Sequence, residues 1–342
     1  MNFAIVGCGV IAETHGKALK MLEAEGCKLY AVCDIVQEKA EKFAEKYGVG
    51  VIYYDDESVM QDSNIDVICV CVPSGTHGLI CKMAAQAGKH IICEKPMEIN
   101  EQKMAEITNV VEKSGIKMQC VFQRRLMPTA QAVKQLICEN KLGKICLAEA
   151  QLKYYRDQAY YDSAGWRGTW KQDGGGALMN QGVHGVDLIF WMLDKEIDTL
   201  YGKAETLARK IEVEDTATAL IQMKDRSLCV IQSATTAYPG FSTTFSVYGE
   251  KGTVIFNDSG ILEWTFIDKE NQPPRPEGNI EIGGSKSNID ITIDGHIILL
   301  RDLKEAIIQN RAPMIPPQDA QLAVKVICSI YQSSKTGKVI QF

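Results

Sequence analysis

The chain has 342 residues, and its 37 Lys and Arg against 43 Asp and Glu give a formal net charge of −6. Apolar residues make up 46% and charged residues 23%, which is ordinary for a globular protein and excludes disordered and fibrous classes. The acidic balance argues against nucleic acid or an anionic membrane as the main partner. No run approaches the roughly 18 apolar residues of a membrane span, and the N-terminus predicts neither a signal peptide nor an anchor.

The first third of the chain alternates β-rich runs with stretches of helical period. Strands are predicted over Asn2–Val6, Lys28–Cys33, Val51–Tyr54, Asp66–Val72, His90–Cys93 and Lys117–Phe122, with helices such as Val10–Glu25, Gln37–Tyr47 and Thr76–Ala87 between them. This alternation predicts βαβ units in a doubly wound parallel sheet. The fold class is therefore α/β, with a Rossmann domain over residues 1–123.

The second half has a different character. After a helix over Thr129–Asn140, short turns separate strands predicted at Ile145–Arg156, Ala217–Met223, Ser227–Thr236, Thr243–Tyr248 and Thr253–Phe256. Strands joined this tightly are antiparallel. Helix Ala177–Leu193 interrupts them, Asn271–Ser287 is predicted to be a loop, and the helices Asp294–Asn310 and Gln318–Ser334 close the chain. Residues 124–342 thus form an α+β domain with a large, mainly antiparallel open sheet; whether the last helix (318–336) packs back on the first domain is left open.

Twelve cysteines raise the question of disulfides or a metal site. Their spacing contains one C-x-C pair, Cys69 and Cys71, and no C-x-x-C pair, and most of them lie inside apolar runs. Such residues behave as buried small hydrophobes. The pattern predicts reduced thiols, a cytoplasmic protein and no metal site.

A cofactor site is predicted directly after the first strand. Gly7, Gly9 and Ala12 form a G-x-G-x-x-A sequence that opens a helix, with Val10 and Ile11 in its first turn. The glycines allow a tight turn and close approach of a pyrophosphate to the helix N-terminus. Asp34 ends the second strand, where a carboxylate accepts a ribose 2′-hydroxyl and repels a 2′-phosphate, so NAD is favoured over NADP.

Two later segments follow strands at the same predicted sheet edge. Open α/β sheets bind ligands beyond the carboxyl ends of their strands. Pro73, Thr76 and His77 follow the fourth strand, and Glu94 and Lys95 follow the fifth. We expect all five to border the cofactor, while His15 and His296 are interpreted as structural.

The chain resembles the Gfo/Idh/MocA oxidoreductases, relatives of glucose–fructose oxidoreductase and inositol dehydrogenase. The resemblance rests on the glycine loop, the Glu94-Lys95-Pro96 motif and the run Gly174-Gly175-Gly176-Ala177-Leu178-Met179-Asn180-Gln181-Gly182-Val183-His184. Glu305-Ala306, Pro313 and Tyr331-x-Ser333-x-x-x-x-Gly337 fit the family too, so the resemblance covers nearly the whole chain.

The resemblance implies that Lys95 and His184 line the nicotinamide. Imidazole titrates near neutrality, so His184 is expected to be the general base, and Lys95 is expected to stabilise the developing alkoxide. Many relatives have aspartate at the position of Asn180, which can contact substrate or orient the ring but cannot accept a proton. Asp187, three residues after His184, either supplies that carboxylate or makes a local structural hydrogen bond.

A substrate pocket is predicted from residues 151–171, which contain six aromatic residues. Aromatic faces pack on sugar rings, and the predicted pocket residues are Arg124, Arg156, Tyr160, Trp166, Arg167 and Asn180. Their basic character within an acidic protein predicts a polyol with an anionic group. The stretch Trp166–Trp170 resembles family members that act on nucleotide-sugar uronates. The alternative is that these aromatic residues pack in the core or at a subunit interface.

The sequence thus predicts an NAD-dependent dehydrogenase acting on a secondary hydroxyl or ketone of a sugar, nucleotide sugar or cyclitol. The alternatives are an NAD-dependent glycosidase that uses transient oxidation and a non-catalytic sugar or NAD sensor. Family resemblance implies a homodimer or homotetramer. Thr216, Thr218, Ser233, Thr235 and Thr243 predict a flat sheet face on which subunits stack.

Overall fold

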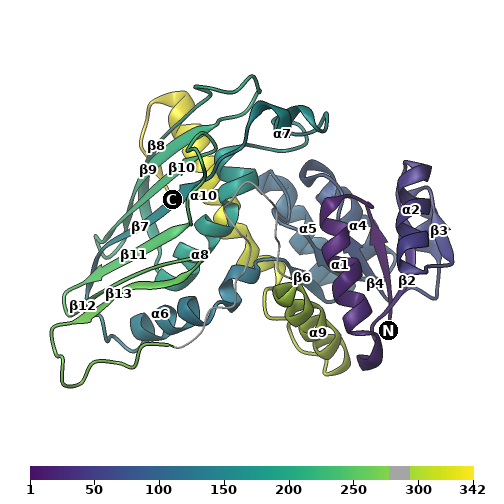
Figure 1. The fold of residues 1–342 in the computed structure, drawn as a ribbon, viewed down its shortest axis with the longest axis horizontal. Coiled ribbons are helices and arrows are strands. Elements are labelled where there is room, and N and C mark those ends of the chain that lie inside the picture. The colour runs from purple at the N-terminus through teal and green to yellow at the C-terminus, as the bar shows by residue number, and fades with distance from the viewer. Residues whose placement is uncertain (277–292) are drawn as a thin grey trace. The chain divides into compact units, whose positions relative to one another are not determined.

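A computed structural model describes residues 1–276 and 293–342 (Figure 1). The chain divides into two compact units. Unit 1 comprises Met1–Gln123 and Thr292–Gln321, and unit 2 comprises Arg124–Ile291 and Leu322–Phe342. Of the predicted loop Asn271–Ser287, residues 277–287 lie outside the described residues.

Unit 1 contains a parallel sheet whose strands, as described, run in the order β3-β2-β1-β4-β5-β6. This is the order of a dinucleotide-binding Rossmann sheet, which confirms the predicted fold. The strands are β1 (Asn2–Val6), β2 (Lys28–Cys33), β3 (Val51–Tyr53), β4 (Val67–Val70), β5 (His90–Cys93) and β6 (Met118–Cys120). Apolar side chains on both faces of β1 and β4 are buried, as expected for central strands covered by helices.

Helices cover this sheet, and one of them comes from late in the chain. They are α1 (Val10–Met21), α2 (Gln37–Tyr47), α3 (Asp56–Gln61), α4 (His77–Gln86), α5 (Glu101–Ser114) and α9 (Asp294–Ile308), with short 3-10 turns at Glu23–Glu25 and Ser74–Thr76. Helix α9 packs against α1 (Figure 1). Its Gly295 lies so close to Gln123 that a Cβ there would be 2.6 Å from that side chain.

Unit 2 contains a mixed sheet with the described strand order β13-β12-β11-β7-β10-β9-β8-β14. Most pairs are antiparallel, as predicted, but β7 and β10 pair in parallel. The strands are β7 (Ile145–Lys153), β8 (Ile197–Glu205), β9 (Thr216–Met223), β10 (Leu228–Ala234), β11 (Thr244–Gly249), β12 (Gly252–Asn257), β13 (Gly260–Phe266) and β14 (Ile340–Gln341). Strands β8, β13 and β14 were not predicted from the sequence.

One face of this sheet is covered by helices. They are α6 (Pro128–Cys138), α8 (Val183–Leu193) and α10 (Pro317–Thr336); α7 (Gln158–Asp162), a 3-10 turn at Gln123–Leu126 and a π-helical segment at Ala177–Gly182 complete the described helical elements. The boundary between the two units falls within α10. Helix α8 lies very close to β7: a Cβ on Gly185 would be only 2.3 Å from the Leu152 side chain, so glycine allows this approach.

The opposite face of the sheet carries exposed side chains, including Thr218, Leu220 and Leu228. The predicted stacking face is wrong for Ser233, Thr235 and Thr243, which are buried. Ser233 alternates in phase with the core residues of β10 and donates a hydrogen bond to the Ala177 carbonyl oxygen at 2.6 Å. Serine and threonine side chains therefore occur on both faces of the unit 2 sheet. A buried hydroxyl is tolerated there when it forms a hydrogen bond, as Ser233 does.

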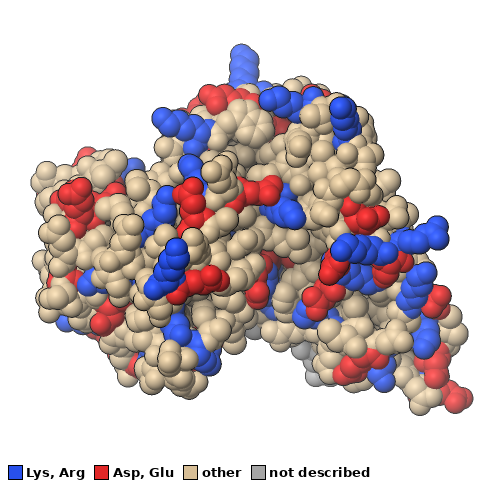
Figure 2. Space-filling model, turned by 180° about the vertical axis from the view of Figure 1, so that it is seen from behind, with Lys and Arg blue, Asp and Glu red and all other residues tan. Residues whose placement is uncertain are grey.

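All twelve cysteines are free thiols, and most are buried, as the sequence analysis expected. Across the described residues, no helix has both the length and the hydropathy that crossing a bilayer would require. On the face drawn in Figure 2, acidic and basic side chains are intermixed.

Candidate active site

The glycine loop between β1 and α1 has the backbone geometry that close approach of a phosphate requires. Gly7 has φ +93°, and a Cβ there would lie 2.8 Å from the backbone of Cys71, so only glycine fits. Above Gly9, by contrast, a Cβ would meet no described atom within 4 Å, which leaves the backbone open. Because Gly9 N-caps α1 without a side-chain acceptor among the described residues, the first N–H groups of α1 suit an anionic ligand.

Asp34 is held beside this loop by backbone hydrogen bonds. Its Oδ2 accepts from the Cys8 N–H and its Oδ1 from the Val36 N–H, both at 2.8 Å. A carboxylate oxygen has two lone pairs, so each oxygen retains one for a ribose hydroxyl. The neighbouring Ile35 is 79% exposed, and Val10 in the first turn of α1 is 60% exposed. Exposed apolar side chains beside an anion-binding helix terminus and a hydroxyl-accepting carboxylate suit a dinucleotide.

His77 joins the segments that follow β4 and β5. Its Nδ1 lies 2.7 Å from the Pro96 carbonyl oxygen and its Nε2 lies 2.8 Å from that of Val72. Burial lowers the pKa of His77. The ring therefore fastens the Glu94-Lys95-Pro96 segment to the segment that contains Pro73 and Thr76, so these predicted residues share one edge of the sheet.

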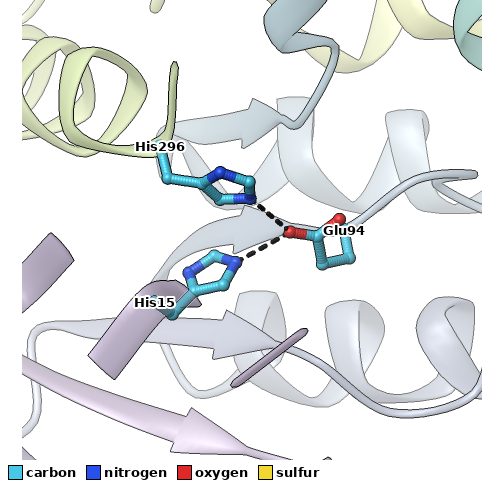
Figure 3. Close-up of side chains that lie close together, drawn as sticks. All are labelled: His15, Glu94 and His296. Carbon is cyan, nitrogen blue, oxygen red and sulfur yellow. Dashed lines mark hydrogen bonds and ion pairs between the residues drawn. The ribbon is translucent and has the colours of Figure 1, made fainter. Parts of the chain in front are cut away.

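Glu94, next to Lys95, is buried and bonded to two histidines. Its Oε1 lies 2.9 Å from Nε2 of His15 and 2.9 Å from Nε2 of His296 (Figure 3). Its Oε2 accepts from the Lys95 backbone N–H at 3.3 Å. Despite burial, which acts in the opposite direction, these imidazoles hold the pKa of Glu94 well below its usual range. Glu94 is therefore a buried carboxylate that anchors the backbone of Lys95.

In unit 2, the predicted helix Ala177–Leu193 begins as a π-helix. Gln181 donates to the Gly176 carbonyl oxygen at 3.1 Å, an i to i−5 bond, and regular α-helix starts at Val183. Such segments are frequent at functional sites. Asn180 lies in the π-helical part and His184 in the first turn of α8, both half-buried. Asn180 and His184 therefore lie in two different helical segments, where one continuous helix over Ala177–Leu193 was predicted.

A buried carboxylate organises the start of this π-helix. Glu214 accepts hydrogen bonds from the Gly176 N–H at 3.0 Å, the Leu178 N–H at 2.8 Å and the Tyr331 hydroxyl at 2.9 Å. Burial raises the pKa of Glu214 to about 7. A Cβ on Gly175 would lie 2.0 Å from the Tyr331 hydroxyl. The glycine run thus allows Glu214 and Tyr331 to reach the helix terminus.

Asn180 is held by side chains on both of its amide atoms. Its Nδ2 donates a short hydrogen bond to Oδ1 of the fully buried Asp173, and its Oδ1 accepts from Gln181 Nε2 at 2.9 Å. Gln181 Nε2 also lies 2.9 Å from the Tyr160 hydroxyl. The carboxylate that the sequence lacks at position 180 is therefore present one contact away, in Asp173.

The predicted substrate residues Arg156, Tyr160, Trp166 and Arg167 form one cluster. The guanidinium carbons of Arg156 and Arg167 lie 5.3 Å and 4.2 Å from the centre of the Tyr160 ring, and Arg167 also lies 4.9 Å from the Trp166 ring. Among the described residues, the buried Nε of each arginine has no hydrogen-bond partner. Both side chains are only half-buried, and two guanidinium charges side by side are suited to bind an anion.

The arginines at positions 124 and 125 are buried and form ion pairs. Arg124 lies 3.0 Å from Asp258. Arg125 binds Asp187 in a bidentate pair, with 2.8 Å and 2.6 Å between donor and acceptor atoms, and lies over the Trp191 ring. Asp187 is thus part of a buried salt bridge to Arg125, a partner that was not predicted from the sequence.

Sequence reasoning missed the roles of Asp173, Glu214 and the Tyr331 hydroxyl. The signal that could have found them was the glycine run at positions 174–176. Three consecutive glycines before a helix indicate that other groups approach the backbone closely. Glu214 and Tyr331 lie 38 and more residues from Gly176 in sequence, so their identity needed the fold, whereas Asp173 directly precedes the run.

Comparison with known proteins agrees with this geometry. Residues 1–122 match the oxidoreductase family with an NAD-binding Rossmann fold, and residues 130–255 match the GFO/IDH/MocA C-terminal domain. A myo-inositol 2-dehydrogenase of Thermotoga maritima is 25% identical over 279 residues, which is 80% of each chain.

Solved structures of WlbA dehydrogenases in complex with NADH and UDP-GlcNAcA are similar over the whole chain. The protein from Bordetella pertussis has 28% identity and a TM-score of 0.88, covering 100% of this chain and 98% of that one. Its counterpart from Chromobacterium violaceum has 27% identity and the same TM-score, with 100% and 96% covered. The chain therefore belongs to the Gfo/Idh/MocA family and is an oxidoreductase that uses NAD as its cofactor.

Proposed function

We propose that this protein transfers hydride between NAD and a secondary hydroxyl or ketone of a sugar that carries an anionic group, such as a nucleotide-sugar uronate. The observation that carries the substrate class is the cluster of the half-buried Arg156 and Arg167 around Tyr160, which places two guanidinium charges side by side. The WlbA relatives, whose structures contain UDP-GlcNAcA, support the same class.

In this proposal, bound NAD supplies the hydride acceptor at its nicotinamide. Gly7, Gly9, Val10, Ile11 and Ala12 would hold the pyrophosphate against the N-terminus of α1, and Asp34 would hold the adenosine ribose. Pro73, Thr76, His77 and Glu94 would border the cofactor at the carboxyl ends of β4 and β5.

His184 is proposed to accept the hydroxyl proton as the substrate is oxidised, because a neutral imidazole has a free lone pair near pH 7. Lys95 is proposed to donate a hydrogen bond to the same oxygen and to stabilise its developing negative charge. The bond from the Lys95 backbone to Glu94 restricts where this ammonium can reach. Asn180 would orient substrate through its bonds to Asp173 and Gln181 rather than accept a proton.

The test is a turnover assay with UDP-GlcNAcA, myo-inositol and unsubstituted glucose, each with NAD and with NADP. Lys95→Ala should keep NAD binding and lose most turnover, while the exposed Lys103→Ala in the same unit should behave as wild type. Wild-type rates in Lys95→Ala would overturn the assignment. Arg167→Gln should raise KM for the anionic sugar about tenfold or more, since a charge-assisted bond contributes ~1.5–3 kcal/mol. Lys171→Gln is its matched control.

The same assay separates the alternatives. Cleavage of a glycoside with no net change in NADH absorbance would indicate a glycosidase that oxidises its substrate transiently. Binding of sugar and NAD without turnover of any substrate would indicate a sensor.

A homodimer or homotetramer is part of the proposal. The open face of the unit 2 sheet, with Leu220 51% exposed and Leu228 39% exposed, supports burial against a second copy. Free, buried thiols support a cytoplasmic location. Light scattering of the purified protein measures its oligomeric state directly, and a monomeric mass would overturn the proposed homo-oligomer.

A further inference from the structure

The fully buried cluster of His15, Glu94 and His296 joins three elements of unit 1 through a single carboxylate oxygen (Figure 3). His15 lies on α1, the helix that begins at the glycine loop, and His296 lies on α9. Glu94 lies between β5 and Lys95. The cluster therefore connects the cofactor-binding helix to the segment that carries the proposed oxyanion-stabilising lysine.

The contacts indicate which ring nitrogens donate hydrogen bonds in this cluster. The pKa of Glu94 is held well below its usual range by its histidine partners, and burial lowers the pKa of His15. An ionised carboxylate oxygen only accepts hydrogen bonds, so each imidazole donates through an Nε2–H. A neutral imidazole then has a bare Nδ1. The two Nδ1 atoms are buried with no hydrogen-bond partner among the described residues, consistent with this tautomer.

Three potential ligand atoms within 4.8 Å of one another also fit the composition of a metal site. Coordination through Nε2 would place the imidazole proton on Nδ1, where a metal-ligating histidine normally has an acceptor. No described group accepts at either Nδ1. The surroundings thus favour two hydrogen bonds to an ionised carboxylate over a bound cation.

We propose that His15, Glu94 and His296 are positioning residues, which set the place of Lys95 relative to α1. This inference rests on the proposed role of Lys95. Glu94 has two functions in it: Oε1 gathers the two helices, and Oε2 holds the backbone N–H of Lys95. Neither histidine is proposed to contact substrate or cofactor. Their effect on turnover passes through the geometry of the Lys95 segment.

Variants at His296 test this. His296→Leu removes one donor to Glu94, and His296→Gln restores an N–H donor in a side chain of similar reach. The control is His90→Leu, which removes a histidine acceptor of the Lys117 N–H elsewhere in the same sheet. At temperatures where all variants are folded, kcat should fall about tenfold or more in His296→Leu, equivalent to a rise of ~1.4 kcal/mol in the activation free energy. His296→Gln should recover most of it, and His90→Leu should stay within about twofold of wild type at a similar loss of Tm.

A kcat for His296→Leu no lower than that of His90→Leu would overturn the proposal. If His296→Leu does not fold, Glu94→Gln replaces it. A carboxamide cannot accept from both histidines and from the Lys95 N–H, because one of its two positions is a donor. The kcat of Glu94→Gln should therefore fall about tenfold or more, as in His296→Leu. Unchanged kcat in Glu94→Gln would also overturn the proposal.

Two further measurements distinguish a failure of the proposed function from a failure of the positioning role. If Lys95→Ala retains wild-type turnover, the proposed function fails; if Lys95→Ala is inactive but His296→Leu is not impaired, only the positioning role fails. Titration of the purified protein with Zn²⁺ completes the test. Saturable binding of one Zn²⁺ per chain that is lost in His15→Leu would overturn the hydrogen-bonded cluster, and its absence supports it.

Discussion

The hydroxyl of Tyr331 donates a hydrogen bond to Oε1 of Glu214 at 2.9 Å, in space left by the absent side chain of Gly175. Glu214 in turn accepts the N–H groups of Gly176 and Leu178 at the start of the π-helix. A residue of the C-terminal helix α10 therefore reaches the glycine run that precedes Asn180 and His184. This contact explains why the run is glycine and leads to the first two predictions.

Gly175→Ala should strongly destabilise the protein. Its φ of +154° disfavours an L side chain, and the added Cβ would lie 2.0 Å from the Tyr331 hydroxyl and 2.7 Å from the Met179 Cβ. Overpacking of this kind costs ~1–3 kcal/mol before backbone strain is added. Thermal unfolding measures the loss. Gly165→Ala is the control, since a Cβ there meets nothing within 4 Å, and an equal loss of Tm in both variants would contradict the explanation.

Glu214 should make stability fall as pH rises. Burial raises its pKa to about 7 in the folded protein, against an ordinary value of 4.5 for a glutamate. Between these values the folded chain keeps a proton that the unfolded chain has released, so unfolding free energy decreases with pH. Compared with Glu214→Gln, wild type should lose about 2–3 kcal/mol between pH 5 and pH 8, at ~1.4 kcal/mol per pKa unit. Urea unfolding at several pH values checks this, and a difference that does not change with pH would refute it.

Asp34→Ser should relax discrimination against NADP, because the negative charge that repels a 2′-phosphate is removed. It should also lower stability, since the Cys8 and Val36 N–H groups lose their acceptor. Asp34→Asn separates the two effects: it keeps one acceptor oxygen but no charge. Both variants should raise the NADP to NAD ratio of kcat/KM about tenfold, equivalent to ~1.4 kcal/mol. An unchanged ratio would mean that Asp34 does not contact the ribose.

Asp187→Leu should destabilise unit 2 by about 3–5 kcal/mol, the usual result of leaving one partner of a buried ion pair behind. The remaining partner would be Arg125, whose guanidinium is bonded by two atoms to Asp187. The double variant Arg125→Met with Asp187→Leu should recover most of the loss, because no buried charge then lacks a counterion. Chemical unfolding of the two single variants and the double variant measures the coupling, and additive losses would contradict it.

The Rossmann unit was readable from the sequence because its determinants are local. Continuous apolar runs predict strands buried on both faces, and Gly7 and Gly9 act through their own backbone. Strand β8 was missed for the opposite reason. Its Gly202 looks like a strand breaker, yet a Cβ there would lie 2.9 Å from Ile330, so the glycine allows the close approach of α10.

Local pattern placed the glycine loop after β1, Asp34 at the end of β2, and Lys95 at the end of β5, since each depends on a strand and the few residues that follow it. It could not show that His296 bonds to Glu94 across 202 positions, or that Tyr331 meets Glu214 across 117. Hydrogen bonds act over about 3 Å, and a chain sequence carries no information on which distant segments come that close until helices and sheets have packed. The sequence by itself therefore determined where the candidate site residues lie along the strands and loops. Only tertiary packing determined which distant side chains hold them in place.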